Sequence, residues 1–209
     1  MKEALKDIKV VVLDFDNTIV KGSEEAKREA WYEVFPDYDT EELNNVLNKA
    51  NEIIAGGKGD RRDVIKIVLE HFGVGYDEIE NEIDKYSELF NEIVQKVIVS
   101  IGVKPEDRKA IEVLSRETNL YVNTATPIKN SRESLEALGI IDLFKGIYGR
   151  PGNKVSNLNE IISIENIRPS ELLFVGDQKS DLDAAKEVNC KFVGVGKIGI
   201  INSLEELLI

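Results

Sequence analysis

The chain has 209 residues, 42% of them hydrophobic, and its 27 basic and 39 acidic side chains give a formal net charge of −12. That charge disfavours nonspecific binding to nucleic acid or to an anionic membrane surface, and no stretch approaches the roughly 18 consecutive apolar residues of a membrane-spanning helix. A single cysteine, Cys190, excludes an intrachain disulfide, and the N-terminus carries no secretory pattern, so we expect a cytoplasmic protein.

An apolar run followed by acidic residues forms the most informative segment, VVVLDFDNTIV at residues 10–20. The run Val10–Leu13 predicts a strand buried on both faces, as in a parallel sheet. Asp14 and Asp16 follow it at once, and carboxylates so close to a buried strand are costly unless something neutralises them. We therefore expect them at the carboxyl end of the strand, where open α/β sheets bind their ligands. A hard divalent cation would neutralise them there.

Residues 23 to 97 have a helical hydrophobic period, which predicts four amphipathic helices. Thr40 and Asp60 are the predicted N-caps of the second and third helices. Between these two helices lies the segment AGGKGDRRD, in which Lys58 and Arg61 concentrate positive charge in an otherwise acidic protein.

The pattern alternates after Pro105. Helices are expected at 106–118, 129–138, 154–164 and 180–188, each followed by a short strand: LYVNT, GIYG, LLFVG and KFVGV, with SLEELL as a short closing helix. Strands that alternate with helices predict a parallel sheet with helical crossovers. Because the first strand precedes the helical segment, we expect one α/β core made of residues 1–19 and 100–209, interrupted by a helical domain at 20–99.

Four groups of polar residues fall at predicted strand ends or helix starts, where one crevice could gather them. In chain order they are Asp14, Asp16 and Thr18; Thr124 in TATP; Lys154 after the turn GRPGN; and Asp177 and Asp181 in GDQKSD. Together they match the motifs DxDxT, TxxP, a lysine and GDxxxD. The chain thereby resembles the haloacid dehalogenase-like (HAD) hydrolase superfamily, in its phosphoglycolate phosphatase and β-phosphoglucomutase-like branch.

The resemblance implies a Rossmann-like parallel sheet with an inserted α-helical cap domain, and Mg²⁺-dependent phosphoryl transfer through an aspartyl phosphate. Asp14 would be the nucleophile and Asp16 the general acid and base, while Thr124 and Lys154 would bind the transferring phosphoryl oxygens.

The resemblance also implies a set of metal ligands. Asp14, Asp177 and the backbone carbonyl of Asp16 would bind Mg²⁺, and Asp181 would anchor that shell or a bound water.

The predicted function is therefore a phosphatase that hydrolyses a small organic phosphate monoester. Asp16 favours this over cleavage of a carbon–halogen bond, since the superfamily's dehalogenases generally lack that carboxylate. Two alternatives remain: a phosphosugar mutase with the same aspartates, and a non-catalytic phosphate-binding or receiver-like protein. The partner would be a small phosphorylated metabolite, with no nucleic acid or membrane, and the protein a monomer or homodimer.

The helical insert should set specificity. We hypothesise that Lys58 or Arg61 contacts the distal part of an anionic substrate. The alternative is a flexible, solvated loop whose arginines simply begin a helix.

Overall fold

The computed structural model describes residues 5–54 and 59–209. Five parallel strands form one sheet in the order β3-β2-β1-β4-β5. The strands are β1 Val10–Leu13, β2 Asn119–Pro127, β3 Gly146–Arg150, β4 Leu172–Gly176 and β5 Lys191–Gly194. The predicted α/β fold with a parallel sheet is confirmed.

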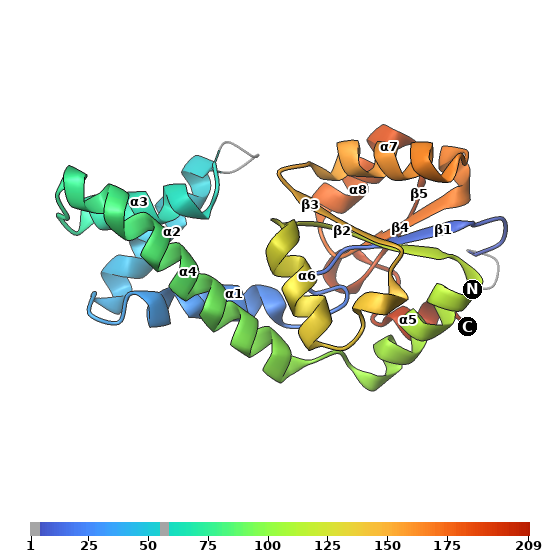
Figure 1. Cartoon of the computed structure of the whole chain (residues 1–209), viewed down its shortest axis with the longest axis horizontal. Coiled ribbons are helices and arrows are strands. Elements are labelled where there is room, and N and C mark those ends of the chain that lie inside the picture. The colour runs from blue at the N-terminus through green and yellow to red at the C-terminus, as the bar shows by residue number, and fades with distance from the viewer. Residues whose placement is uncertain (1–4, 55–58) are drawn as a thin grey trace. The chain divides into compact units, whose positions relative to one another are not determined.

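Both faces of this sheet are covered by helices. Figure 1 shows α7 (Lys154–Glu165) and α8 (Lys179–Val188) on one side of the sheet and α5 (Pro105–Glu117) on the other, while α6 (Ile128–Ala137) contacts β2 and β3. This explains why all four residues of β1 are fully buried and apolar: the strand pairs on both edges and packs on both faces.

The connection order places a switch point at β1. The chain passes from β1 to β2 and β3 on one side, then returns to β4 and β5 on the other. In an open parallel sheet, the carboxyl ends of the strands that flank such a point border a crevice, which is where ligands bind. The residues that follow β1, β2 and β4 therefore converge at one edge of the sheet.

Four helices form the other part of the chain: α1 Ser23–Val34, α2 Thr40–Ile54, α3 Arg61–His71 and α4 Tyr76–Ile101. Contacts divide the chain into two compact units, residues 1–24 with 98–209 and residues 25–97. We call them the sheet unit and the helical unit.

Of the two predicted N-caps in the helical unit, Asp60 is confirmed and Thr40 is wrong. Asp60 caps α3, since its side chain accepts from the backbone of Arg62. At the start of α2, however, the carboxylate of Asp39 accepts from the backbone N–H of Glu42, so Asp39 has the role predicted for Thr40.

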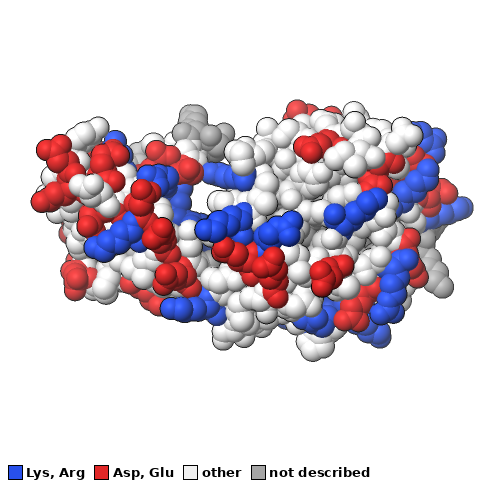
Figure 2. All heavy atoms as spheres, in the orientation of Figure 1, with Lys and Arg blue, Asp and Glu red and all other residues white. Residues whose placement is uncertain are grey.

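Asp and Glu side chains are interspersed with Lys and Arg on the face drawn in Figure 2. Among the described residues, no helix combines the length and apolar character needed to cross a bilayer.

Glu171, the last residue of the short 3-10 helix Pro169–Glu171 before β4, makes a testable contribution to stability. Bonds from Lys9 and from the backbone and guanidinium of Arg168 lower the pKa of Glu171 to about 2, from 4.5. A lowered carboxylate pKa stabilises the folded state above the unfolded-state value, and the effect is lost as pH falls from 4.5 toward 2. We expect Glu171→Gln to lower the melting temperature at pH 7 by a few degrees.

Thermal denaturation across pH 2 to 7 measures this effect. The difference between wild type and Glu171→Gln should shrink as the pH falls. Glu187→Gln, which changes an exposed carboxylate on α8, is the matched control and should melt as wild type does. A difference that stays constant over this pH range would contradict the assignment.

Candidate active site

Three aspartates meet at the carboxyl ends of β1 and β4. Asp14 follows β1 directly, and its backbone N–H donates to the carbonyl of Val175 in β4 at 2.8 Å, so it stands beside the end of that strand. Asp177 follows β4, and Asp181 lies in the first turn of α8. One carboxylate oxygen from each of these three aspartates lies within 4.8 Å of the others.

This donor set fits a hard divalent cation. Carboxylate oxygens are the ligands that Mg²⁺ and Ca²⁺ prefer, and three negative charges so close together require neutralisation. Asp177 also carries a buried oxygen, Oδ1, that has no hydrogen-bond partner. Burial raises the pKa of Asp177, and so does the neighbouring Asp181. A cation bound here would reverse both effects, so the residues present suit a metal site.

Lys154 supplies a positive charge within the same cluster. Its Nζ donates to Oδ1 of Asp14 at 2.9 Å and forms a second ion pair with Asp181. Burial alone would lower the pKa of Lys154, but the two carboxylates together raise it above its usual value, so the ammonium stays charged. Burial raises the pKa of Asp14, and Lys154 opposes that shift. The pKa of Asp14 is nonetheless raised to about 8, because burial and the neighbouring charges of Asp181 and Asp16 outweigh Lys154, so a bound cation would be needed to keep this carboxylate fully ionised at neutral pH.

A glycine allows Asp181 to approach this closely. A Cβ added at Gly176, the last residue of β4, would lie 2.5 Å from the carboxylate of Asp181. The same carboxylate accepts from the backbone N–H of Gln178 at 3.0 Å, which fixes it in the first turn of α8. The motif GDxxxD thus has a steric reason for its glycine as well as a chemical one for its aspartates.

Asp16 is buried and is held by a residue that the sequence analysis did not single out. The hydroxyl of Thr126 donates to Oδ2 of Asp16 at 3.2 Å. Thr124 is also buried, and its Oγ1 accepts from the backbone N–H of Thr126 at 3.1 Å. Strand alternation gave no signal for Thr126, because it follows the predicted strand end and lies where the register of β2 with β3 shifts between Asn123 and Pro127.

The two residues proposed to contact the substrate, Lys58 and Arg61, both belong to the helical insert. Lys58 lies outside the described residues. Arg61, the first residue of α3, places its guanidinium 4.2 Å from the ring centroid of Phe90 and hydrogen-bonds Asn91, both in the helical unit.

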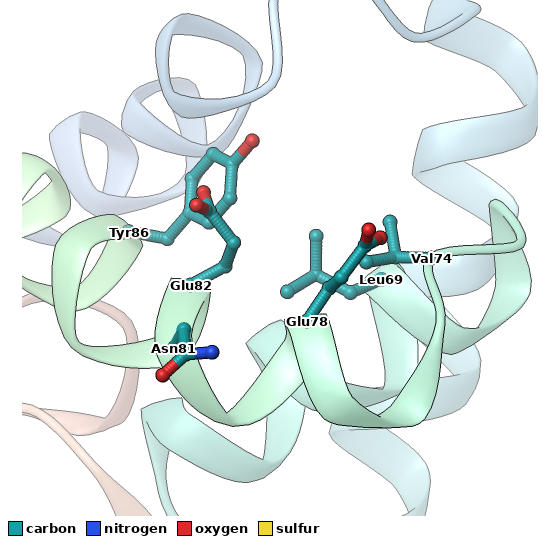
Figure 3. Close-up of a pocket in the computed structure, with 6 residues that line it drawn as sticks. All are labelled: Leu69, Val74, Glu78, Asn81, Glu82 and Tyr86. Atoms are coloured by element: carbon teal, nitrogen blue, oxygen red, sulfur yellow. The ribbon is translucent and has the colours of Figure 1, made fainter.

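A pocket of about 400 Å³ lies within the helical unit (Figure 3). Its lining residues are Leu69, Val74, Glu78, Asn81, Glu82 and Tyr86. None of the predicted site residues that the structure describes lines this pocket.

The family model for haloacid dehalogenase-like hydrolases matches residues 8–189, which includes every strand except β5. The chain belongs to this family. The match spans all four motif groups, from Asp14 to Asp181, and so supports the HAD resemblance that those motifs indicated.

Individual relatives are distant. A phosphoglycolate phosphatase of Vibrio parahaemolyticus is 23% identical over 202 residues, covering 91% of this chain and 84% of the relative. The magnesium-bound HAD-hydrolase YfnB of Bacillus subtilis has a TM-score of 0.71 at 17% identity, covering 96% of both chains. A β-phosphoglucomutase of Clostridium difficile has a TM-score of 0.67 at 21% identity, covering 96% of this chain and 93% of that one. At such identities, the structural likeness shows the fold alone.

Proposed function

We propose that this hydrolase is a Mg²⁺-dependent phosphatase that cleaves a small organic phosphate monoester through an aspartyl phosphate at Asp14. The observation that carries the proposal is the surrounding of Asp14. Its buried carboxylate lies 2.9 Å from the Lys154 ammonium and shares a three-aspartate cluster with Asp177 and Asp181. A carboxylate that attacks a phosphate, itself an anion, needs positive charge fixed beside it. Lys154 supplies one such charge, and the three aspartates could bind a cation that supplies another.

The chain's own residues can be assigned a role in each step. Asp14 would attack phosphorus while Asp16 protonates the departing oxygen. Asp16 would then take a proton from the water that cleaves the acyl phosphate. Thr124 and Lys154 would bind the phosphoryl oxygens, as donors fixed before the reaction begins.

Asp14, Asp177 and the carbonyl of Asp16 would hold the metal, with Asp181 anchoring their arrangement. When bound, Mg²⁺ would offset the repulsion between carboxylate and phosphate and orient both. The magnesium in the YfnB structure supports the choice of metal.

The substrate class rests on the relatives. The phosphoglycolate phosphatase of Vibrio parahaemolyticus supports a small phosphorylated metabolite. We also propose that residues 20–99 act as a cap that sets specificity, and that Lys58 or Arg61 contacts the distal end of the substrate. The protein would act as a cytoplasmic monomer or homodimer.

A phosphosugar mutase is the second candidate, favoured by the likeness to the β-phosphoglucomutase of Clostridium difficile. Both reactions would use Asp14 and Asp16. They differ in the acceptor, which is water for a phosphatase and a sugar hydroxyl for a mutase.

A panel of phosphorylated metabolites tests the proposal, with and without Mg²⁺. We expect release of inorganic phosphate from at least one monoester, 2-phosphoglycolate among those tested. Conversion of β-glucose 1-phosphate into an isomeric phosphosugar, with little free phosphate, would favour the mutase. Absence of metal-dependent turnover on every ester would contradict both and favour a binding protein.

Removal of the metal ligand Asp177 gives a prediction that needs no substrate. We expect Asp177→Asn to weaken Mg²⁺ binding by more than about 10²-fold. Mutating residues that only hydrogen-bond to metal ligands already lowers metal affinity by about 10 to 100-fold. Isothermal titration calorimetry with MgCl₂ measures this, and the rise in melting temperature on adding Mg²⁺ should vanish in the variant.

The control is Asp183→Asn on the same helix as Asp181. Asp183 is an exposed partner of Lys179. Its variant should bind Mg²⁺ as wild type does. Equal affinities for wild type and Asp177→Asn would remove Asp177 from the ligand set.

A further inference from the structure

Two buried asparagines connect β2 to the start of α7. Asn123 lies in β2 immediately before Thr124 and is fully buried, and Asn157 lies in the first turn of α7, 5% exposed. The Nδ2 of Asn157 donates to Oδ1 of Asn123 at 2.9 Å, and the Nδ2 of Asn123 donates to the backbone carbonyl of Lys154 at 2.9 Å. The two carboxamides thus form a short chain that ends on the backbone of Lys154.

The direction of this chain follows from its last member. A backbone carbonyl can only accept a hydrogen bond, so the nitrogen of Asn123 must face Lys154. The oxygen of Asn123 is then left for the donor of Asn157. A buried amide that lacks a hydrogen-bond partner is costly, so loss of either of these two hydrogen bonds should weaken the other.

The surrounding backbone is fitted to Asn157. A Cβ added at Gly152 would collide with Oδ1 of Asn157. The backbone N–H of Asn157 donates to the carbonyl of Asn153, the N-cap residue of α7. The asparagine is therefore built into the first turn of the helix that carries Lys154.

The location of these bonds suggests their purpose. Lys154 must reach Asp14 and Asp181 from a different element, and its side chain has several rotatable bonds. The hydrogen bond between the backbone of Lys154 and the strand that carries Thr124 fixes the positions of two donors relative to Asp14. These donors are the Lys154 ammonium and the Thr124 hydroxyl. We propose that Asn123 and Asn157 are positioning residues that hold Lys154 where its ammonium reaches Asp14. Their effect on turnover rests on the proposed function, whereas their effect on Lys154 does not.

The far end of α7 offers a matched control. Glu165, the last residue of the helix, accepts from the hydroxyl of Tyr121 and from the side chain of Asn119 at 2.8 Å, both in β2. Those bonds link the same helix to the same strand, roughly 16 Å from Lys154 along the helix axis. If the asparagines only stabilise the packing of α7 on β2, then removing a bond at either end should have similar consequences.

Asn157→Leu and the double variant Asn123→Val/Asn157→Leu test the proposal against Tyr121→Phe. The double variant removes both partners of the amide bond and leaves neither of these two side chains buried and unpaired, which guards against simple unfolding. We expect both asparagine variants to lose about 10 to 10²-fold in kcat, the typical penalty for misplacing a group by about 1 Å, with KM changing much less. Tyr121→Phe should keep wild-type kcat, even if its melting temperature falls as far.

A second measurement needs no turnover. In protein labelled with nitrogen-15 lysine, the Lys154 ammonium, held between Asp14 and Asp181, should give a protected NMR signal that Lys154→Met removes. The asparagine variants should broaden or shift this signal, and Tyr121→Phe should leave it unchanged. If wild type hydrolyses no phosphate ester, the proposed function fails while this signal still tests the positioning. A Lys154 signal and a kcat unchanged in the asparagine variants would overturn the inference, as would equal changes in Tyr121→Phe.

Discussion

Asp14→Asn should abolish turnover, with a loss of at least about 10⁴-fold in kcat, as is typical when an enzyme loses its nucleophile. The substitution keeps the size of the side chain but removes both the nucleophilic oxygen and the charge that Lys154 faces at 2.9 Å. Steady-state release of phosphate measures the loss. Denaturing gels or mass spectrometry after rapid acid quenching should find an added phosphoryl group on Asp14 in wild type and none in the variant.

The control for Asp14→Asn is a second buried carboxylate in the sheet unit. Asp107 in α5 is fully buried and accepts from the backbone N–H of Leu204 at 2.6 Å. Asp107→Asn makes the same chemical change at a carboxylate that does not belong to the three-aspartate cluster and should retain turnover. Phosphorylation found at another residue, or full turnover in Asp14→Asn, would refute the proposed nucleophile.

Asp16→Asn should slow turnover by about 10²–10⁴-fold on an alkyl phosphate, the usual contribution of a general acid and base. The loss should depend on the leaving group. Nitrophenolate departs without being protonated, so the first step on p-nitrophenyl phosphate should survive. The second step needs a base to activate water, so the phosphoenzyme should accumulate. Stopped-flow absorbance should then record a burst of nitrophenolate equal to the enzyme concentration, followed by slow turnover.

Thr126→Val should have a smaller effect on turnover than Asp16→Asn. It removes the hydroxyl that donates to Oδ2 of Asp16 but leaves the carboxylate in place. We expect a smaller loss on alkyl phosphates and no burst. If Asp16→Asn slowed alkyl and nitrophenyl esters equally and gave no burst, Asp16 would not be the acid and base.

Much of the fold could be predicted because buried residues are apolar and recur with the period of a helix or follow one another in a buried strand. The four apolar residues of β1 are buried, and so are Val64, Ile65, Val68 and Leu69 of α3, which recur at the spacing of one helix face. The ends of elements were harder to predict. Asp39 and Thr40 are both good capping residues, and only the position of the first turn of α2 shows that Asp39 caps it.

The candidate site could be predicted in part. Asp14, Asp177 and Asp181 follow strands at recognisable spacing, and the structure brings their oxygens within 4.8 Å. Their roles in chemistry stay predictions. Asn123 and Asn157 carried no such signal, because a polar residue inside a strand and another in a helix, 34 residues apart, indicate nothing until they face each other.

The order of residues alone was enough to indicate a parallel α/β sheet, a helical insert and a set of acidic strand ends, because each of these depends on local periodicity or on a short motif. The partners of each side chain required the folded chain. The hydroxyl of Thr126 on Asp16, the two carboxamides behind Lys154 and the contact that requires Gly176 all join segments distant in sequence or depend on the turn between strand and helix. Such bonds depend on distance and direction in space, and sequence spacing records neither.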